Sequence, residues 1–330
     1  MKNLIILDSE IRRDLKEFYE SLEGGSEVVI TTYETPLIRK VRNFKIVGSP
    51  FYHFLMWKKS YNYAKKLIEK DVKKIVCLNP LVGIFLGLFN DKGIDITLAG
   101  FLFEPKRNKI YYNLRKYLVN RTLKNVNRVV VYSNKEVEYY SNIFDNYKDK
   151  FKFVHYGLDY KNSSEYDGVL PEKFIFSGGG SNRDYETLVK AMELSNIDNK
   201  LVIATQPWRV PYHNNKNIIV KSDVVIENFG NVMQKSQVLV LSLKDTELSA
   251  GHMVMLQAMK LRVPIIVNDI PAIRDYVDES MVTFYQSKNA EQLSNILKSF
   301  KVDIEKINKA ESLYNSVYTS KSLIDRLVLE

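Results

Sequence analysis

The fold is decided by the stretch Glu247-Leu-Ser-Ala-Gly-His-Met-Val-Met-Leu-Gln-Ala-Met-Lys-Leu-Arg-Val-Pro-Ile-Ile-Val-Asn-Asp269. An apolar run over 238–243 precedes it, and the small residues 249–251 open a helix that runs to about Arg262. The apolar residues 263–267 follow as a second strand. Strand, turn, helix and strand in this order make a parallel crossover, whose turn lies where open α/β sheets bind ligands. The first N–H groups of such a helix have no intrahelical partner, which suits an anion. A plain surface loop is the alternative interpretation.

The rest of the chain shows the same alternation of strand-like and helix-like runs. In the first half, strands are predicted at Leu4–Leu7, Glu27–Thr31, Phe44–Val47, Lys74–Leu78, Ile94–Ala99, Arg128–Tyr132 and Val154–Asp159, and helices near 10–22, 52–69, 80–89, 108–125 and 134–144. In the second half, strands are predicted at Phe174–Ser177, Leu201–Thr205 and Ile218–Lys221, and helices at 184–193, 228–235 and from Asn289 to Glu330, with breaks near Val302 and Thr319. This pattern predicts an α/β fold with two Rossmann-like domains in tandem and a cleft between them.

Chain length supports two domains, because 330 residues exceed one ordinary hydrophobic core. The polar, glycine-bearing run 161–170 is the best linker in the sequence. It separates an N-terminal Rossmann-like domain over 1–160 from a C-terminal one over 171–305. Residues 306–330 are expected to form terminal helices that pack back on the first domain.

Composition excludes several classes of protein. The single cysteine, Cys77, excludes intrachain disulfides and a four-cysteine metal site, and it indicates a reducing compartment. The amino terminus reaches Asp8 after an apolar run too short for a signal peptide. The most apolar window, 75–89, has 15 residues, whereas a membrane span needs roughly 20. Asn79 as N-cap and Pro80 at the first helical position predict a strand followed by a buried helix there.

A second feature that suits phosphate is Phe176-Ser-Gly-Gly-Gly-Ser-Asn-Arg-Asp-Tyr-Glu186. Three glycines directly after a strand allow close backbone approach, and Asn182 or Ser181 is expected to cap the helix that begins near Arg183. Arg183 occupies the place of the third glycine of Gly-x-Gly-x-x-Gly, which disfavours hydride chemistry. A glycine turn with one arginine suits a diphosphate, because the guanidinium neutralises its charge. A tight turn with a surface arginine is the alternative.

Together these two stretches resemble GT-B glycosyltransferases, specifically the large retaining family (family-four-like) whose second domain carries a Glu-x7-Glu element. The run Ser249 to Met259, followed by Val263-Pro-Ile-Ile-Val267, matches the position of that element. Residues 178–191 match the family's glycine turn and first helix, and 154–159 resemble its hydrophobic-x-x-Gly-x-Asp hinge. The resemblance covers about 154–285; over the first half it rests on the order of strands and helices.

The sequence departs from that family at both glutamates of the element. Counting back eight residues from Gln257 reaches Ser249, and Glu247 lies two residues too early. In the family the second glutamate binds the ribose hydroxyls of the sugar nucleotide, a role open to Gln257 because its amide both donates and accepts hydrogen bonds. The first glutamate lies by the donor sugar. Ser249 lacks its charge, and Glu247 or Asp245 could replace it if the turn is reshaped.

The resemblance implies that a nucleotide diphosphate lies between the glycine turn and the start of the second helix, without a metal or other cofactor. No Asp-x-Asp occurs in the chain, and Asp245-Thr-Glu247 is the nearest approach to it. No two of the four histidines have metal-ligand spacing; His252 lies at the expected phosphate edge, and His155 is the next candidate. The implied catalytic residues are Arg183, Glu247 and Ser249. The implied donor-binding residues are Gly178, Gly179, Gly180, Ser181, Arg183, Ala250, Gly251, His252, Met253 and Gln257.

The excess positive charge is confined to the first half of the chain. Residues 1–170 carry 29 Lys and Arg against 20 Asp and Glu, whereas residues 171–330 carry 19 of each. Within 105–128, Tyr111, Leu114, Leu118 and Val119 recur at helical spacing among eight basic residues. Such a helix suits an anionic membrane, a pyrophosphate-linked lipid or an anionic polysaccharide. The residues assigned to the acceptor or membrane are Trp57, Lys58, Lys59, Lys106, Arg107, Lys109, Arg115 and Lys116.

Two other interpretations of the basic helices are a solvated helix face and a nucleic-acid surface. The neutral second half and the absence of a nucleic-acid-binding motif disfavour nucleic acid.

The sequence therefore predicts an enzyme, a glycosyltransferase of the hexosyltransferase type that is retaining by resemblance. It would move a sugar from a UDP- or GDP-sugar to a glycan or lipid-linked glycan in cell-surface polysaccharide synthesis. A cytoplasmic location is expected, with peripheral attachment at the inner face of the membrane. Two other classes stay open, namely a non-catalytic relative that binds nucleotide sugar or glycan, and a GT-B-shaped epimerase or phosphorylase.

Overall fold

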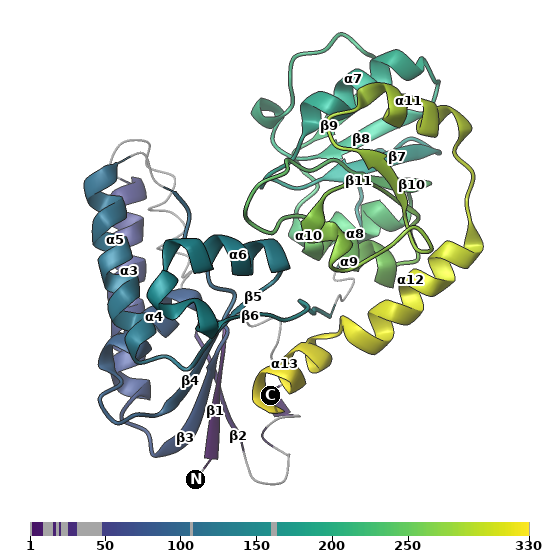
Figure 1. The fold of residues 1–330 in the computed structure, drawn as a ribbon. Helices are drawn as coiled ribbons and strands as arrows, with labels where there is room; N and C mark the ends of the chain where they lie inside the picture. The colour runs from purple at the N-terminus through teal and green to yellow at the C-terminus, as the bar shows by residue number, and fades with distance from the viewer. Residues whose placement is uncertain are drawn as a thin grey trace. The chain divides into compact units, whose positions relative to one another are not determined.

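The computed structural model describes residues 2–8, 16–17, 20, 26–31, 48–105, 108–159 and 164–329. The chain divides into two compact units (Figure 1). Unit 1 comprises Met1–Tyr132, Val137–Val154 and Asp325–Glu330, and unit 2 comprises Ser133–Glu136 and His155–Ile324.

The described part of unit 1 is built on a sheet of six strands. They are β1 (Lys2–Leu7), β2 (Ser26–Ile30), β3 (Val72–Cys77), β4 (Asp95–Ala99), β5 (Arg128–Val131) and β6 (Phe151–Phe153). The strand order is β2-β1-β3-β4-β5-β6, and all neighbours are parallel. Residues 4–7 and 75–77 have no exposed surface, because strands covered on both faces are apolar throughout.

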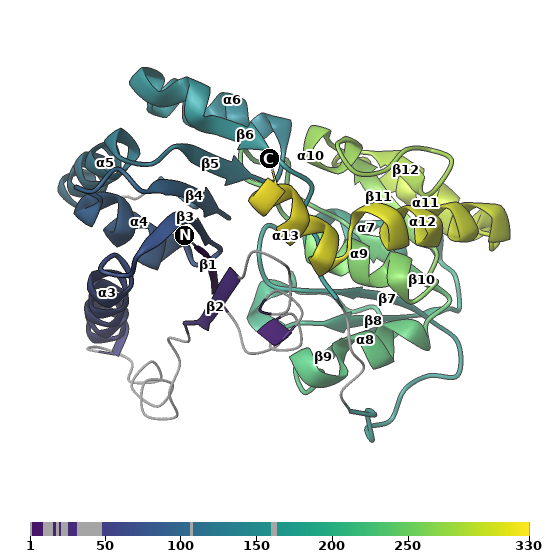
Figure 2. The ribbon, with the colours of Figure 1, turned by 90° about the horizontal axis from the view of Figure 1, so that it is seen from below.

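Three helices of unit 1, α3 (Gly48–Leu67), α4 (Pro80–Phe89) and α5 (Lys109–Lys124), lie side by side along one face of this sheet (Figure 2). The helix α6 (Asn134–Ile143) and the short 3-10 helix η2 (Asp145–Lys150) connect β5 to β6. Asn79 caps α4 as predicted, because its side chain accepts a hydrogen bond from the backbone N–H of Val82 at 3.3 Å and Pro80 follows it.

The end of α5 is fixed by a lysine from further along the chain. The Lys150 Nζ donates to the carbonyl oxygens of Leu123 and Val126, each at 2.6 Å. Burial lowers the pKa of Lys150, and the cation offsets the negative end of the helix dipole.

The described part of unit 2 is also built on a six-stranded parallel sheet. Its strands are β7 (Phe174–Gly178), β8 (Lys200–Ala204), β9 (Ile218–Lys221), β10 (Val238–Leu241), β11 (Ile265–Asp269) and β12 (Thr283–Gln286). They lie in the order β12-β11-β10-β7-β8-β9, again all parallel. This is the order of a dinucleotide-binding Rossmann sheet, with its switch point between β7 and β10.

Helices cover both faces of the second sheet. Figure 1 shows α7 (Tyr185–Ser195) and α11 (Ala290–Ser299) on one side, and α8 (Ile226–Gln234) and α9 (His252–Lys260) on the other. The remaining helices are η3 (Pro207–Arg209), α10 (Pro271–Arg274), α12 (Ile304–Val317) and α13 (Ser320–Leu329). The breaks that separate α11, α12 and α13 confirm those predicted near Val302 and Thr319.

The α/β fold with two Rossmann-like domains is confirmed, but one predicted strand is wrong. Residues 154–159 are not a strand; the strand is β6, which ends at Phe153. The backbone of Leu158 pairs with other groups, since its N–H donates to the carbonyl oxygen of Tyr318 at 3.0 Å and its own carbonyl accepts from the Tyr314 hydroxyl at 2.7 Å. Neither β12 nor α10 was predicted. The strand predicted at Phe44–Val47, most of the helix predicted over 10–22 and part of the linker lie outside the described residues.

Within the described ranges, no helix combines the length and apolar character needed to cross a bilayer. No group of three or more histidine, cysteine or acidic side chains in the same ranges is arranged to hold a metal ion.

The contact between α4 and α5 depends on Gly87. A Cβ at this position would lie 2.6 Å from the Thr122 Cγ2 and 2.8 Å from the Val126 Cγ2. We expect Gly87→Ala to destabilise unit 1 by about 1–3 kcal/mol through overpacking, measured as a shift in the urea unfolding midpoint. Asn120→Ala, on the half-buried part of α5, should change stability by less than about 0.5 kcal/mol. Equal stability of the two variants would contradict the close packing of these helices.

Candidate functional site

The loop after β7 makes a turn that requires glycine. At Gly178, a Cβ would lie 2.6 Å from the Phe229 ring and 3.1 Å from the carbonyl oxygen of Ala204. Gly179 has a φ of +105°, a backbone conformation that residues with side chains rarely adopt. Its carbonyl oxygen accepts a hydrogen bond from the Tyr185 hydroxyl at 2.6 Å. The shape of this turn is therefore set by backbone sterics and by helix α7.

The Arg183 side chain folds back over the same turn. Its Nε donates to the carbonyl oxygen of Gly178 at 2.8 Å, and a terminal nitrogen donates to that of Ser181 at 2.7 Å. The other terminal nitrogen would be 2.5 Å from a Cβ on Gly179. Burial lowers the pKa of Arg183, although a guanidinium keeps its charge at neutral pH. Arg183 therefore orders the turn, a role that the sequence did not predict.

The helix cap after this turn differs from the prediction. Helix α7 begins at Tyr185, and its cap is Asp184, not Asn182 or Ser181. One Asp184 carboxylate oxygen accepts from the Thr187 N–H at 3.1 Å, and the other accepts from the Thr187 hydroxyl at 2.6 Å. The predicted cap is wrong because the turn continues through Asn182, which has a φ of +52°.

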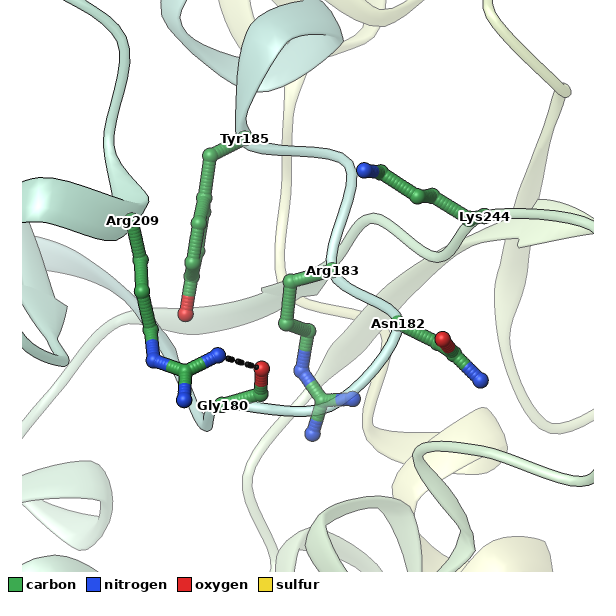
Figure 3. A pocket seen from close by; sticks show the side chains of 6 residues that line it. All are labelled: Gly180, Asn182, Arg183, Tyr185, Arg209 and Lys244. Carbon is green, nitrogen blue, oxygen red and sulfur yellow. Dashed lines mark hydrogen bonds between the residues drawn. The ribbon is translucent and has the colours of Figure 1, made fainter. Parts of the chain in front are cut away.

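Beside the turn lies a pocket of about 290 Å³. It is lined by Gly180, Asn182, Arg183, Tyr185, Arg209 and Lys244 (Figure 3). In Figure 3 the guanidinium groups of Arg183 and Arg209 both point toward the backbone near Gly180, whose carbonyl oxygen accepts from Arg209. Burial raises the pKa of Tyr185, and the charges of the two arginines oppose that rise. A lining with three cations and no carboxylate suits an anion such as a phosphate or diphosphate.

The pocket lies at the switch point of the second sheet. The loops after the neighbouring strands β7 and β10 meet there, because the Lys244 N–H donates to the carbonyl oxygen of Asn182 at 2.9 Å and the Asp184 N–H to that of Ser242 at 3.0 Å. Open α/β sheets bind their ligands at this place, outside the carboxyl ends of the strands.

Of the predicted donor-binding residues, Gly180 and Arg183 line this pocket, whereas Asn182, Tyr185, Arg209 and Lys244 were not predicted as donor-binding residues. One signal was present for the two cations. Arg209 follows the carboxyl end of β8 and Lys244 follows the carboxyl end of β10, which is where a doubly wound sheet gathers its ligand contacts.

The second predicted turn opens α9 at Gly251, which has a φ of +83° and no side chain to cap the helix. A Cβ there would lie 2.9 Å from the Leu243 Cδ1. The Met253 side chain is 56% exposed. Among the described residues, the lining of the pocket includes none of Ala250, Gly251, His252 and Met253. The second predicted turn therefore lies outside the lining of this pocket and is linked to it through the loop after β10.

The His252 side chain is buried at the start of α9. Its Nε2 lies 2.9 Å from the carbonyl oxygen of Ala272, and its ring centroid lies 4.3 Å from that of Tyr276. Burial is the main cause that lowers the pKa of His252 to about 4, and the charge of Arg183 acts in the same direction. The neutral imidazole donates through Nε2. His155, the other candidate, similarly has its Nε2 at 2.9 Å from the carbonyl oxygen of Asp275.

Three further residues were predicted to act on the donor. The Ser249 Oγ is buried and has no hydrogen-bond partner among the described residues. Gln257 is half-buried on α9. The Glu247 side chain is 56% exposed, and its carboxylate lies 4.0 Å from the Lys135 Nζ.

The residues assigned to an acceptor or membrane belong to unit 1. Lys106 and Arg107 lie outside the described residues, and the others lie on α3 and α5: Trp57, Lys58, Lys59, Lys109, Arg115 and Lys116. Trp57 and Arg115 make packing contacts within unit 1. Trp57 lies edge-on to Phe85 with the ring centroids 5.7 Å apart, and the Arg115 guanidinium lies 4.8 Å from the centroid of Phe103. The two side chains therefore also stabilise unit 1.

The fold is that of GT-B glycosyltransferases, with a Rossmann-like domain around each of the two six-stranded parallel sheets of the described residues. Sucrose-phosphate synthase from Thermosynechococcus elongatus is similar in structure, with a TM-score of 0.66 and 13% identity over 99% of this chain and 97% of that one. HepE from Anabaena, in complex with UDP-glucose, has a TM-score of 0.65 and 10% identity over 100% and 98% of the two chains.

A third similar structure is the lipopolysaccharide outer core galactosyltransferase WaaB, with a TM-score of 0.60 and 12% identity over 100% of this chain and 99% of that one. At such identities the similarities establish the fold. No protein-family model matches the sequence, and no curated protein matches it either.

The buried His252 makes the stability of unit 2 depend on pH. Its folded pKa of about 4 lies below the ordinary value of 6.5, so the unfolded state binds more protons between these values. Its contribution is complete above pH 6.5 and is lost as the pH falls toward 4. Between pH 7 and 5 we expect a loss of about 2 kcal/mol. His252→Gln, which keeps a donor for Ala272 but does not titrate, should remove this part of the loss.

The measurement is urea unfolding of the unmodified chain and of His252→Gln at the two pH values, followed by far-ultraviolet circular dichroism. An unchanged pH dependence in His252→Gln would contradict the assignment.

Proposed function

We propose that the chain is a glycosyltransferase that moves a sugar from a UDP- or GDP-sugar to a glycan or a lipid-linked glycan. The observation that carries the proposal is the pocket formed by Arg183, Arg209 and Lys244 at the switch point of a GT-B domain. HepE, which shares the fold, has been crystallised with UDP and with UDP-glucose. A nucleoside diphosphate is therefore the first anion to test in this pocket.

The chemistry of transfer explains why cations are needed. The bond between the anomeric carbon and a diphosphate oxygen breaks, and its electron pair goes to the diphosphate. An acceptor hydroxyl oxygen forms the new bond to the sugar, and its proton passes to an oxygen of the leaving diphosphate. Negative charge grows on the leaving diphosphate, so cations held beside it stabilise the transition state more than the ground state. Arg183 and Arg209 are held by carbonyl oxygens of the turn, which makes them preorganised for this role.

The rest of the donor is assigned to the neighbouring elements. The N–H groups of Gly180, Ser181 and 250–253 bind the diphosphate and the adjoining part of the nucleotide, since the Gly179 N–H donates to the carbonyl oxygen of Ala204. The Gln257 amide binds the ribose hydroxyls. The exposed Glu247 supplies the carboxylate beside the donor sugar that Ser249 lacks. Retention of configuration belongs to the same proposal.

Binding of the nucleotide tests the pocket directly. We expect Arg209→Gln and Lys244→Gln each to weaken UDP or GDP binding by about 10- to 100-fold, because each removes one charge-assisted contact worth about 1.5–3 kcal/mol. Isothermal titration calorimetry with both diphosphates gives the affinities. Arg183→Lys, which keeps the charge but loses the two bonds to the turn, should also weaken binding.

The matched control is Lys235→Gln, which removes one exposed lysine at the end of α8 outside the pocket. Its affinity should stay within about twofold of the unmodified chain. Equal affinities in Lys244→Gln, Arg209→Gln and the control would remove the diphosphate from this pocket.

A non-catalytic nucleotide-sugar-binding protein is the second candidate, and the serine and glutamine at 249 and 257 favour it. Turnover of a nucleotide sugar distinguishes a glycosyltransferase from a non-catalytic binding protein. If the chain is a transferase, Glu247→Gln should lower kcat by about 100-fold or more while the affinity for the diphosphate changes little, because the carboxylate acts on the sugar. The assay is release of the nucleoside diphosphate with and without added glycan. Tight binding without any release in the unmodified chain would favour the non-catalytic protein.

The same assay tests the GT-B-shaped epimerase or phosphorylase. An epimerase would convert the nucleotide sugar without an acceptor, and a phosphorylase would need glycan and phosphate. Release that depends on an acceptor hydroxyl would exclude both.

A further inference from the structure

Helix α5 carries apolar side chains on its solvent side. Ile110, Leu114 and Tyr117 are 82%, 55% and 59% exposed, and their spacing of four and three residues places them on one stripe. The buried residues of this helix are Val119, Thr122 and Leu123, on the opposite side. Helical spacing in the sequence predicts that Leu114 and Val119 belong to one apolar stripe. In the structure they lie on opposite sides of the helix. A surface helix of a globular protein has the reverse arrangement, with polar residues facing water.

The apolar surface continues on α3. Phe51 and Phe54 are 47% and 60% exposed, and Lys58 and Lys65 follow at the spacing that places them on the same stripe. Helix α3 packs on α4, and α4 packs on α5 (Figure 2). The exposed apolar residues of the two outer helices therefore belong to one helical layer of unit 1.

Helix α4, between them, is apolar on both sides. Its buried residues are Val82, Gly83, Leu86 and Gly87. Its outer residues Phe85 and Phe89 are only partly covered, because the Tyr61 ring meets each of them edge-on with centroid distances of 5.7 and 5.2 Å. The aromatic cluster therefore extends the apolar surface between α3 and α5.

The charge of this layer has one sign. Helices α3, α4 and α5 together contain nine lysine and arginine residues and no aspartate or glutamate. Of these, Lys58, Lys65, Lys66, Lys109, Arg121 and Lys124 are exposed. Exposed apolar residues among cations, without any anion, match a surface that offers hydrocarbon and negative headgroups together.

We infer that the layer of α3, α4 and α5 is a docking surface for an anionic lipid bilayer, with Phe51, Phe54, Ile110, Leu114 and Tyr117 entering the headgroup region and the surrounding lysines binding lipid phosphates. Each basic residue near such a surface strengthens binding by about fivefold. The inference concerns unit 1 and does not rest on the proposed transfer reaction. It supplies a reason for a lipid-linked acceptor, which would be presented at the same surface.

The test is co-sedimentation of the full chain with vesicles of phosphatidylcholine that contain about one third phosphatidylglycerol, in about 0.15 M NaCl. We expect binding to these vesicles, at least tenfold weaker binding to phosphatidylcholine alone, and a progressive loss as the salt concentration rises. Equal binding to both vesicles, or binding to neither, would overturn the inference.

The variant Ile110→Ser/Leu114→Ser/Tyr117→Ser should lower the partition coefficient by at least 30-fold, because three side chains no longer leave water on docking. The control is Ile226→Ser/Val302→Ser/Ile304→Ser, which removes three apolar residues of unit 2 that are 80%, 54% and 57% exposed. The control should bind vesicles like the unmodified chain.

Lys109→Gln/Lys124→Gln is a second variant that leaves the apolar residues in place and should weaken binding by at least tenfold at the same salt.

Two other partners of this layer, a second copy of the chain and nucleic acid, predict results that differ from those expected for a lipid bilayer. If a second copy of the chain covers this layer, analytical ultracentrifugation will show a dimer that the Ile110→Ser/Leu114→Ser/Tyr117→Ser variant abolishes. If nucleic acid is the partner, the chain will bind duplex or single strands at about 0.15 M salt and will not bind the anionic vesicles. Either result would overturn the lipid assignment. Because UDP or GDP affinity should be unchanged in all of these variants, a failure here is distinguishable from a failure of the nucleotide pocket.

Discussion

The contact between the turn after β7 and the loop after β10 is the constraint on which the candidate site depends. Backbone hydrogen bonds from Lys244 to Asn182 and from Asp184 to Ser242 join the two loops. They are possible because β7 and β10 are neighbours at the point where the strand order reverses. Only this adjacency brings Lys244, from the loop after β10, to the same pocket as Arg183. Arg183 from the turn after β7 and Lys244 from the loop after β10 thus line the same pocket. Their positive charges favour an anionic ligand there.

The two units present different surfaces, and the difference follows from their composition. Unit 2 contains a small pocket whose two arginines are held by carbonyl oxygens of the turn after β7, an arrangement suited to one compact and highly charged group. Unit 1 exposes apolar side chains and lysines over three helices that contain no acidic residue, an arrangement suited to an extended partner. The uneven charge of the two halves of the chain thus corresponds to two kinds of surface.

Most secondary structure could be predicted because local patterns specify it. Asn79 and Pro80 start α4 through side-chain and backbone chemistry that needs no distant partner. Errors occurred where distant groups decide. Residues 154–159 have a strand-like sequence, but the hydrogen bonds of Leu158 go to Tyr314 and Tyr318. The helix cap moved to Asp184 because the turn before it extends to meet the loop after β10.

By itself, the sequence determined the alternation of strands and helices, the glycine positions of the turn and the location of excess charge, because each depends on residue type and near-neighbour spacing. Tertiary structure alone decided which side chains share the pocket. Arg209 and Lys244 follow strands that are separated in sequence from β7 and meet its turn only through the order of the sheet. It also decided that Ile110, Leu114 and Tyr117 face outward, because the burial of Val119 and Leu123 fixes the rotation of α5.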